Sequence, residues 1–226
     1  MSHGPSEALP PGIRREALSR DAFAGVEAAF HALFVASFEP SQRRLVRRRG
    51  APSLNDDGCL PGPSVEELLE SERGRLHGYF SGPELVGFTL TLELGGFSFG
   101  DYLARDLSRG DLVGLGSSML ACWLEEVDAR NQDAMIEVEP PAPNPNSAGP
   151  AGRGRLALFE RAGFKPLPSI PYSLPGGPPM LLAFRPSHRR LRRLLRDTEL
   201  TLDAREISML TDELSATYGA ARSTIE

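Results

Sequence analysis

The sequence predicts an α/β (α+β) fold, with one main domain built on a mixed, mostly antiparallel central sheet flanked by helices. Residues 76–80 and 85–94 are strand-like runs separated by a Ser-Gly-Pro-Glu turn at 81–84, which suits a hairpin. Residues 97–104 then lead through a loop into an apolar-periodic helix and on to a short strand at 134–138. A strand that returns by a helix to the same sheet predicts a parallel pair with a right-handed crossover.

Apolar spacing and cap residues predict the other elements. Residues 21–38 indicate one core-facing helix, because their large apolar residues recur on one helical face. Ser64 and Glu67 form a capping box that begins a second helix, and a short helix is expected at 156–162. The last two strands are expected at residues 164–167 and 180–184.

Three parts follow along the chain. Residues 1–12 are rich in Pro, Ser and Gly and are expected to be poorly ordered. Residues 13–186 form the predicted domain, and residues 187–226 form a C-terminal helical extension with an arginine-rich first half. The apolar stripe of the extension either covers the main domain or pairs with a second copy, and its small size favours the first arrangement.

Charge and cysteine content limit the function classes. The 226 residues carry 25 Lys and Arg against 30 Asp and Glu, a net charge of −5 that argues against general nucleic-acid binding. Cys59 and Cys122 give no disulfide framework, and no apolar run has membrane-spanning length or the form of a signal peptide. We therefore expect a cytoplasmic protein without a membrane partner. The four histidines are scattered without ligand spacing, so no metal is expected.

The stretch from Arg109 to Ser117, RGDLVGLGS, joins a strand-like run to the apolar-periodic helix. Its glycines allow close backbone approach, and the free amides at the start of a helix suit a phosphate. A Walker loop is excluded because no Gly-Lys-Ser/Thr follows, and the dinucleotide fingerprint is excluded because Met119 replaces its third glycine. A tight turn without a ligand is the alternative. The loop resembles the acyl-CoA loop of the GCN5-related N-acetyltransferases, Arg/Gln-x-x-Gly-x-Gly/Ala, with Asp111 at its first position.

Further segments resemble the same family and occur in its order. The glycine loop follows Gly87-Phe88 and Tyr102-Leu103-Ala104, and precedes the strand that ends at Glu139. Residues 159–164, FERAGF, are similar to the family's Tyr-Glu-Arg-x-Gly-Phe motif, which joins a helix end to a strand start. The resemblance covers roughly residues 20 to 185.

This resemblance implies a single acyl-CoA N-acyltransferase-like domain whose sheet splays at the parallel pair. A pantetheine arm would bond to the exposed strand backbone there, and the diphosphate would bind mainly to amides of the glycine loop. Asp111 brings a like charge near the diphosphate unless its side chain turns away or Arg109 neutralises it. The residues implied to contact acetyl-CoA are Leu103, Ala104, Arg105, Arg109, Asp111, Leu112, Val113, Gly114, Leu115, Gly116, Ser117 and Phe159.

Glu137 and Glu139 are the candidate bases for the ammonium proton of an acceptor amine. They lie two apart on a strand, so both point to one face while Val138 points to the other. A strand with one polar, wet face is the alternative. The family's usual thiolate acid is a tyrosine at the position that Phe159 holds here. Tyr172 is a candidate replacement if its loop folds over the gap, and a loop anchor is its alternative role.

The implied function is transfer of an acetyl group from acetyl-CoA to a small-molecule amine by direct attack, without a metal. The alternative is a module similar to the GCN5-related N-acetyltransferases (GNAT-like) that binds CoA or another ligand without turnover. Phe159 and Asp111 favour this alternative. No nucleic-acid or membrane partner is expected, and the protein is expected to be a monomer or a homodimer.

Overall fold

The computed structural model describes residues 8–38, 64–138, 150–172, 180–187, 190 and 204–218. Its strands are β1 (Ile13–Ala17), β2 (Gly74–Ser81), β3 (Glu84–Leu94), β4 (Phe97–Arg105), β5 (Asp133–Val138), β6 (Lys165–Tyr172) and β7 (Met180–Arg185). Its helices are α1 (Arg20–Ala24), α2 (Glu27–Ser37), α3 (Val65–Glu70), α4 (Leu115–Ala129), α5 (Pro150–Arg161) and α7 (Ala204–Tyr218). None of these described helices is long and apolar enough to cross a membrane.

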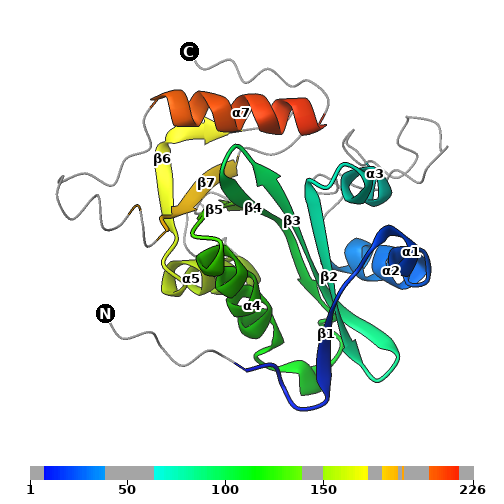
Figure 1. Cartoon of the computed structure of the whole chain (residues 1–226). Helices are drawn as coiled ribbons and strands as arrows, with labels where there is room; N and C mark the ends of the chain where they lie inside the picture. Colours follow the sequence, from blue (N-terminus) through cyan, green and yellow to red (C-terminus); the bar gives the residue numbers. More distant parts are fainter. Residues whose placement is uncertain are drawn as a thin grey trace.

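The strands form one sheet in the order β1-β2-β3-β4-β5-β7-β6, and Figure 1 shows helices on both of its faces. Within the described residues β4 and β5 are parallel, and every other neighbouring pair is antiparallel. The predicted fold class, a mostly antiparallel mixed sheet with one parallel pair, is therefore confirmed. Helix α4 supplies the predicted crossover between the parallel strands.

The parallel pair separates part-way along its length. β4 and β5 are paired from Phe97 with Asp133 to Gly100 with Ile136. Beyond that point β4 stays paired with β3 as far as Arg105, while β5 continues with β7. The register between β3 and β4 shifts at the same place, which leaves Asp101 as the extra residue of a β-bulge. A bulge bends and twists its strand, so it accounts locally for the divergence of β4 from β5.

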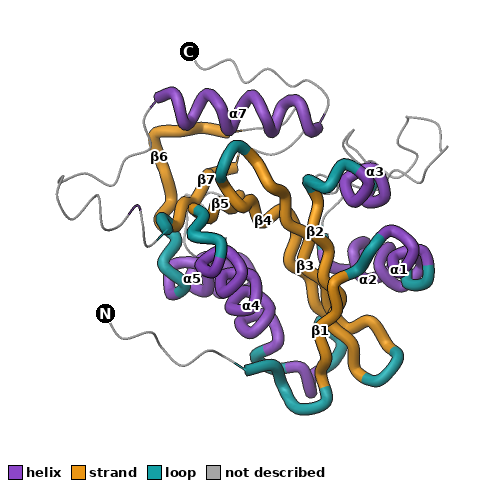
Figure 2. Tube along the Cα trace, in the orientation of Figure 1, coloured by secondary structure: helices purple, strands orange, loops and turns teal. Residues whose placement is uncertain are grey.

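The two faces of the sheet have separate cores, and Figure 2 shows the helices that cover them. Phe97, Phe99 and Tyr102 of β4 belong to the core under α1, α2, α3 and α7. Ser98, on the opposite face, accepts a hydrogen bond from the indole of Trp123 on α4 at 3.0 Å. Phe99 and Tyr102 share a face although they are three residues apart, because the bulge at Asp101 restores the alternation.

The first helical segment is divided, contrary to the single helix predicted at 21–38. α1 begins after Ser19, whose hydroxyl accepts from the Ala22 amide, and ends at Gly25, whose amide donates to the Ala22 carbonyl. α2 then starts after Val26, which has a non-helical backbone. The apolar spacing of the sequence continues across the break between α1 and α2, because both helices bury phenylalanines in the same core. The capping box predicted for α3 is present, with Ser64 and Glu67 bonded reciprocally.

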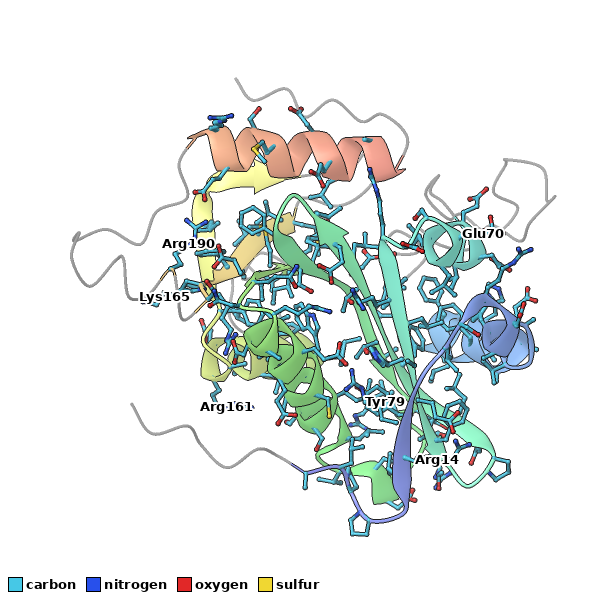
Figure 3. All side chains as sticks on the ribbon, viewed as in Figure 1. Arg14, Glu70, Tyr79, Arg161, Lys165 and Arg190 are labelled. Carbon is cyan, nitrogen blue, oxygen red and sulfur yellow. The ribbon has the colours of Figure 1, made fainter. Side chains whose placement is uncertain are left out.

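Both ends of the described chain contact the domain. Ala8 accepts a hydrogen bond from the Ser118 hydroxyl at 3.1 Å, and Leu9 packs beside the start of α4. Residues 8–12 of the predicted N-terminal tail therefore have a defined position, while residues 1–7 lie outside the described residues. At the other end, Leu214 of α7 is fully buried in the core under α1, α2, α3 and α7. Arg190, labelled in Figure 3, bonds to Asp133 of β5 at 2.6 Å and to Glu206 of α7.

A polar cluster connects α4 to the first two strands. The carboxylate of Glu126 on α4 forms an ion pair with Arg15 of β1 and lies 3.3 Å from the imidazole of His77 on β2. Burial lowers the pKa of His77 to about 4, and the positive charge of Arg15 acts in the same direction. Glu126 opposes this shift, whereas Arg75 and Arg130 add to it weakly. His77 is therefore neutral at pH 7.

Acidification is expected to destabilise the protein through His77. Above pH 6.5 the His77 imidazole is neutral in both the folded and the unfolded state. Below pH 6.5 the imidazole becomes protonated in the unfolded chain, whereas in the folded chain it stays neutral until the pH approaches its lowered pKa of about 4. Stability should therefore fall between pH 6.5 and about 4, by about 1–2 kcal/mol once solvent screening is allowed for. Urea unfolding of the wild type and a His77→Gln variant across this range measures the difference. Equal losses in both proteins would contradict this role for His77.

Candidate active site

The parted strands expose one edge of β4. From Tyr102 to Arg105 this strand is paired with β3 on one side. On the other side, no ladder joins β4 to β5 beyond Gly100 in the described part of the chain. The Asp106 amide bonds to Val86 of β3, and residues of an antiparallel strand alternate in this respect, so the backbone groups of Ala104 also bond to β3, contrary to the prediction for Ala104, whereas those of Leu103 and Arg105 face the gap. An extended ligand can bond to such an edge as an added strand would.

The glycine loop connects this edge to α4. A short 3-10 turn (Gly110–Leu112) is followed by Val113, whose side chain is 81% exposed, and by Gly114 in a left-handed conformation with φ of +88°. Only glycine adopts that conformation without strain, so the backbone itself requires Gly114. The amides of Leu115, Gly116 and Ser117 occupy the first turn of α4, where no partner exists within the helix. The loop therefore presents converging donors and the positive end of the helix dipole.

An apolar platform holds this loop in place. Leu112, Leu115 and Met119 are buried together with Tyr79 and Val86 of the sheet. Figure 3 shows Tyr79 between the strands and α4, and its hydroxyl lies 3.5 Å from the Met119 carbonyl. Since the side chains of Leu112 and Leu115 face this core, only their backbone groups can serve a ligand.

The charge of Asp111 is neutralised within the loop. Arg109 donates two hydrogen bonds to its carboxylate, at 2.8 and 2.7 Å, and a third to Glu84 at 2.7 Å. These hydrogen bonds lower the pKa of Asp111 below its ordinary value. Glu84 begins β3, so Arg109 fastens the loop to the hairpin between β2 and β3. The sequence suggested that Arg109 could neutralise Asp111, but it gave no sign of Glu84.

Carboxylates follow the last paired residues of both parallel strands. Glu137 comes directly after Ile136 and is half-buried. It pairs in register with Leu182, which belongs to the core under α1, α2, α3 and α7. Its side chain therefore points to the face that carries Tyr102. Asp101 comes directly after Gly100 at the bulge, and one of its carboxylate oxygens is buried.

Glu139 lies outside the described residues. Asp101 was missed by sequence reasoning, although a signal was present. Phe97 and Phe99 alternate along the strand, and the next large aromatic residue is Tyr102 rather than residue 101. A break of this kind in a strand-like run indicates a bulge, and bulges often re-aim side chains beside active sites.

Phe159, at the position of the family's tyrosine, and Tyr172, the candidate replacement acid, have different surroundings. Phe159 lies on α5 and contacts Phe164 edge-to-face at 6.0 Å, and Phe164 stacks on Trp123 at 5.9 Å. Phe159 therefore packs against the core between α4, α5 and the sheet. Tyr172 ends β6, opposite Met180, whereas a loop position was predicted. β6 is an edge strand, where its prolines are tolerated, and β7 separates it from β5 by two strand spacings, about 10 Å.

The described residues contain no group of three or more His, Cys, Asp or Glu side chains that could hold a metal ion. The opened strands carry the carboxylates of Asp101 and Glu137 and the guanidinium of Arg105. The arrangement is therefore suited to binding an anionic, extended ligand beside groups that accept a proton.

No protein-family model matches the sequence, and no curated protein matches it. A solved structure from Bacteroides thetaiotaomicron, described as an acetyltransferase of the GNAT family, is similar over 92% of this chain and 99% of its own. The TM-score is 0.58 and the sequence identity is 17%. The chain has the fold of the GCN5-related N-acetyltransferases.

Two further solved structures are similar to this chain at lower TM-scores. The ribosomal-protein-S18-alanine N-acetyltransferase from Escherichia coli matches over 77% of this chain and 94% of its own, with 16% identity and a TM-score of 0.47. ElaA from Escherichia coli matches over 76% and 99%, with 15% identity and a TM-score of 0.47. At the 17% identity of the Bacteroides thetaiotaomicron structure the shared property is the fold, so the activity must be argued from the residues of the site.

Proposed function

We propose that the protein is an N-acetyltransferase that transfers the acetyl group of acetyl-CoA to the amine of a small molecule. One observation carries the proposal. The opened edge of β4, the glycine-containing first turn of α4 and two carboxylates meet where β4 and β5 part. Each part suits one portion of the reaction: the edge for the pantetheine arm, the amides for the diphosphate, and the carboxylates for the amine.

The donor would bind mainly through backbone groups. The amide groups of the pantetheine arm would bond to the backbone of Leu103 and Arg105, continuing the sheet across the gap. The diphosphate would accept from the first-turn amides of α4, beside Gly116. Because backbone donors cannot rotate away, this binding mode needs little reorganisation when the donor arrives.

The chain's carboxylates supply the base. An amine is largely an ammonium ion at neutral pH, so it must lose a proton before its nitrogen attacks the thioester carbonyl. Glu137 and Asp101 flank the gap and would hold the cation and accept that proton, directly or through water, and Glu139, which lies outside the described residues, is a further candidate. The new C–N bond then forms as the C–S bond breaks.

The position of the family's tyrosine supplies no acid for the departing thiolate. Phe159 has no proton to donate, and it is partly buried against the core between α4, α5 and the sheet. A free thiol has a pKa of about 8.5, so its thiolate is a stable leaving group that water can protonate after departure. The proposed reaction therefore does not require a replacement for the family's tyrosine, and Tyr172 stays a candidate only.

Thiol release tests the proposal. Purified protein is mixed with acetyl-CoA, with and without members of an amine panel, and free CoA thiol is followed with time. We expect amine-dependent release above the background without protein, together with CoA binding by calorimetry. CoA binding without release for any amine would favour the alternative, a module that binds CoA without turnover, which the apolar setting of Phe159 supports. Absence of both would refute the proposed function.

A further inference from the structure

We infer that Arg105 is the side chain that contacts the diphosphate of the donor, and that Arg109 serves instead to hold the loop. This inference rests on the proposed function, and it concerns which of two neighbouring arginines recognises the ligand. The family-like loop pattern would give that task to a basic residue at position 111, where this chain has Asp111. A different residue must then supply the positive charge.

Arg109 is committed to other contacts. Its guanidinium donates to both carboxylate oxygens of Asp111 and to one of Glu84, so two carboxylates surround one cation. A diphosphate that approached this guanidinium would have to displace a carboxylate or meet its negative charge. Arg109 therefore fixes the conformation of the loop and adds no net positive charge to it.

Arg105 is placed at the first turn of α4. Successive residues of β4 alternate between faces, and Leu103 packs on the side of α4, so the side chain of Arg105 is directed to the same side. Its Cδ atom is the nearest neighbour of Gly116, 3.9 Å from where a Cβ of that residue would lie. The arginine stem thus borders the space left open by the glycine.

The guanidinium of Arg105 has few competing contacts. Within the described residues its one hydrogen bond is a long one, 3.4 Å, to the backbone carbonyl of Asp106. The carboxylate of Asp106 is itself engaged by the amide and hydroxyl of Ser108, at 2.8 and 2.6 Å. Arg105 can therefore turn toward an anion on the first-turn amides without breaking an ion pair. A planar guanidinium also suits phosphate oxygens better than an ammonium does.

The test compares Arg105→Gln, Arg105→Lys and a matched control, Arg20→Gln. Arg20 is an exposed arginine on α1 that pairs with Glu70, so its replacement makes the same charge change on the other face of the sheet. Calorimetry with CoA and with dephospho-CoA, which keeps the diphosphate and lacks the 3′-phosphate, measures affinity. We expect Arg105→Gln to weaken both ligands by the same factor, roughly 10- to 50-fold, and to reduce the salt dependence of binding.

The controls separate recognition from folding. Arg105→Lys keeps the positive charge and should recover most of the CoA affinity that Arg105→Gln loses. If the loss of affinity came from a change in the fold, restoring the charge alone would not recover it. Arg20→Gln should bind as the wild type does. Wild-type affinity in a folded Arg105→Gln variant would overturn the inference alone, as would a loss seen with CoA and absent with dephospho-CoA. Failure of the wild type to bind CoA would overturn the proposed function and this inference together.

Discussion

Removal of the carboxylates at the parted strands is expected to lower turnover by roughly two to four orders of magnitude while acetyl-CoA binding persists. The variants are Glu137→Gln, Asp101→Asn and Glu139→Gln, made singly and in combination. Glu137 and Asp101 each follow the last paired residue of their strand, so they flank the gap where the thioester would lie. Each amide is nearly isosteric with the carboxylate that it replaces but cannot accept the ammonium proton. The loss should therefore appear in kcat and not in donor affinity.

Turnover across a range of pH identifies which carboxylate acts. Loss of the base should shift the acidic limb of the profile to higher pH, because activity then follows the small fraction of amine that is already neutral in solution. Glu16→Gln is the matched control, since Glu16 lies on β1 and pairs with Arg14 at the far edge of the sheet. If the triple variant keeps full activity and an unchanged pH profile, none of the three is the base and the proton leaves through water.

Local patterns were sufficient for most of the fold. Alternation and turn residues placed the hairpin of β2 and β3, and the Gly-rich loop before an apolar-periodic segment placed the β4–α4–β5 crossover. Gly163, which follows the helix predicted at 156–162, has a φ of +91°, as suits a glycine after a helix end. The break between α1 and α2 was missed, because one apolar stripe continues through Gly25 and hides the change of direction. β6 extends beyond the predicted end at 167 because its edge position tolerates prolines.

The site was only partly accessible from sequence, because much of it depends on contacts between distant residues. The glycine loop is a local motif and could be read directly. The partner of Arg109 at Glu84 is 25 residues away and belongs to another turn. The approach of Arg105 to Gly116 arises only when β4 and α4 pack together. Asp101 needed the register of β4 against β3, and alternation alone predicts register only where no bulge intervenes.

Replacement of Gly116 by valine is expected to weaken CoA binding by roughly 100-fold or more, because the branched side chain would hold the diphosphate away from amides whose charge-assisted bonds contribute about 1.5–3 kcal/mol each. The fold should tolerate the change. A Cβ at this position meets only the Cδ atom of Arg105, at 3.9 Å, and the residue has ordinary helical geometry. Valine also has a higher helix propensity than glycine.

Replacement of Gly114 by valine is not an equivalent test, because its φ of +88° makes any side chain there a source of backbone strain, about 1–2 kcal/mol.

Ala129→Val is a better control, since it introduces the same side chain at an exposed position at the other end of α4. Calorimetry with CoA should show wild-type affinity for Ala129→Val and an intermediate loss for Gly116→Ala, whose methyl group intrudes less. Thermal unfolding confirms that each variant is folded. A folded Gly116→Val protein that binds CoA as the wild type does would show that the diphosphate does not lie on the first turn of α4, and the donor would then have to bind elsewhere along the opened edge of β4.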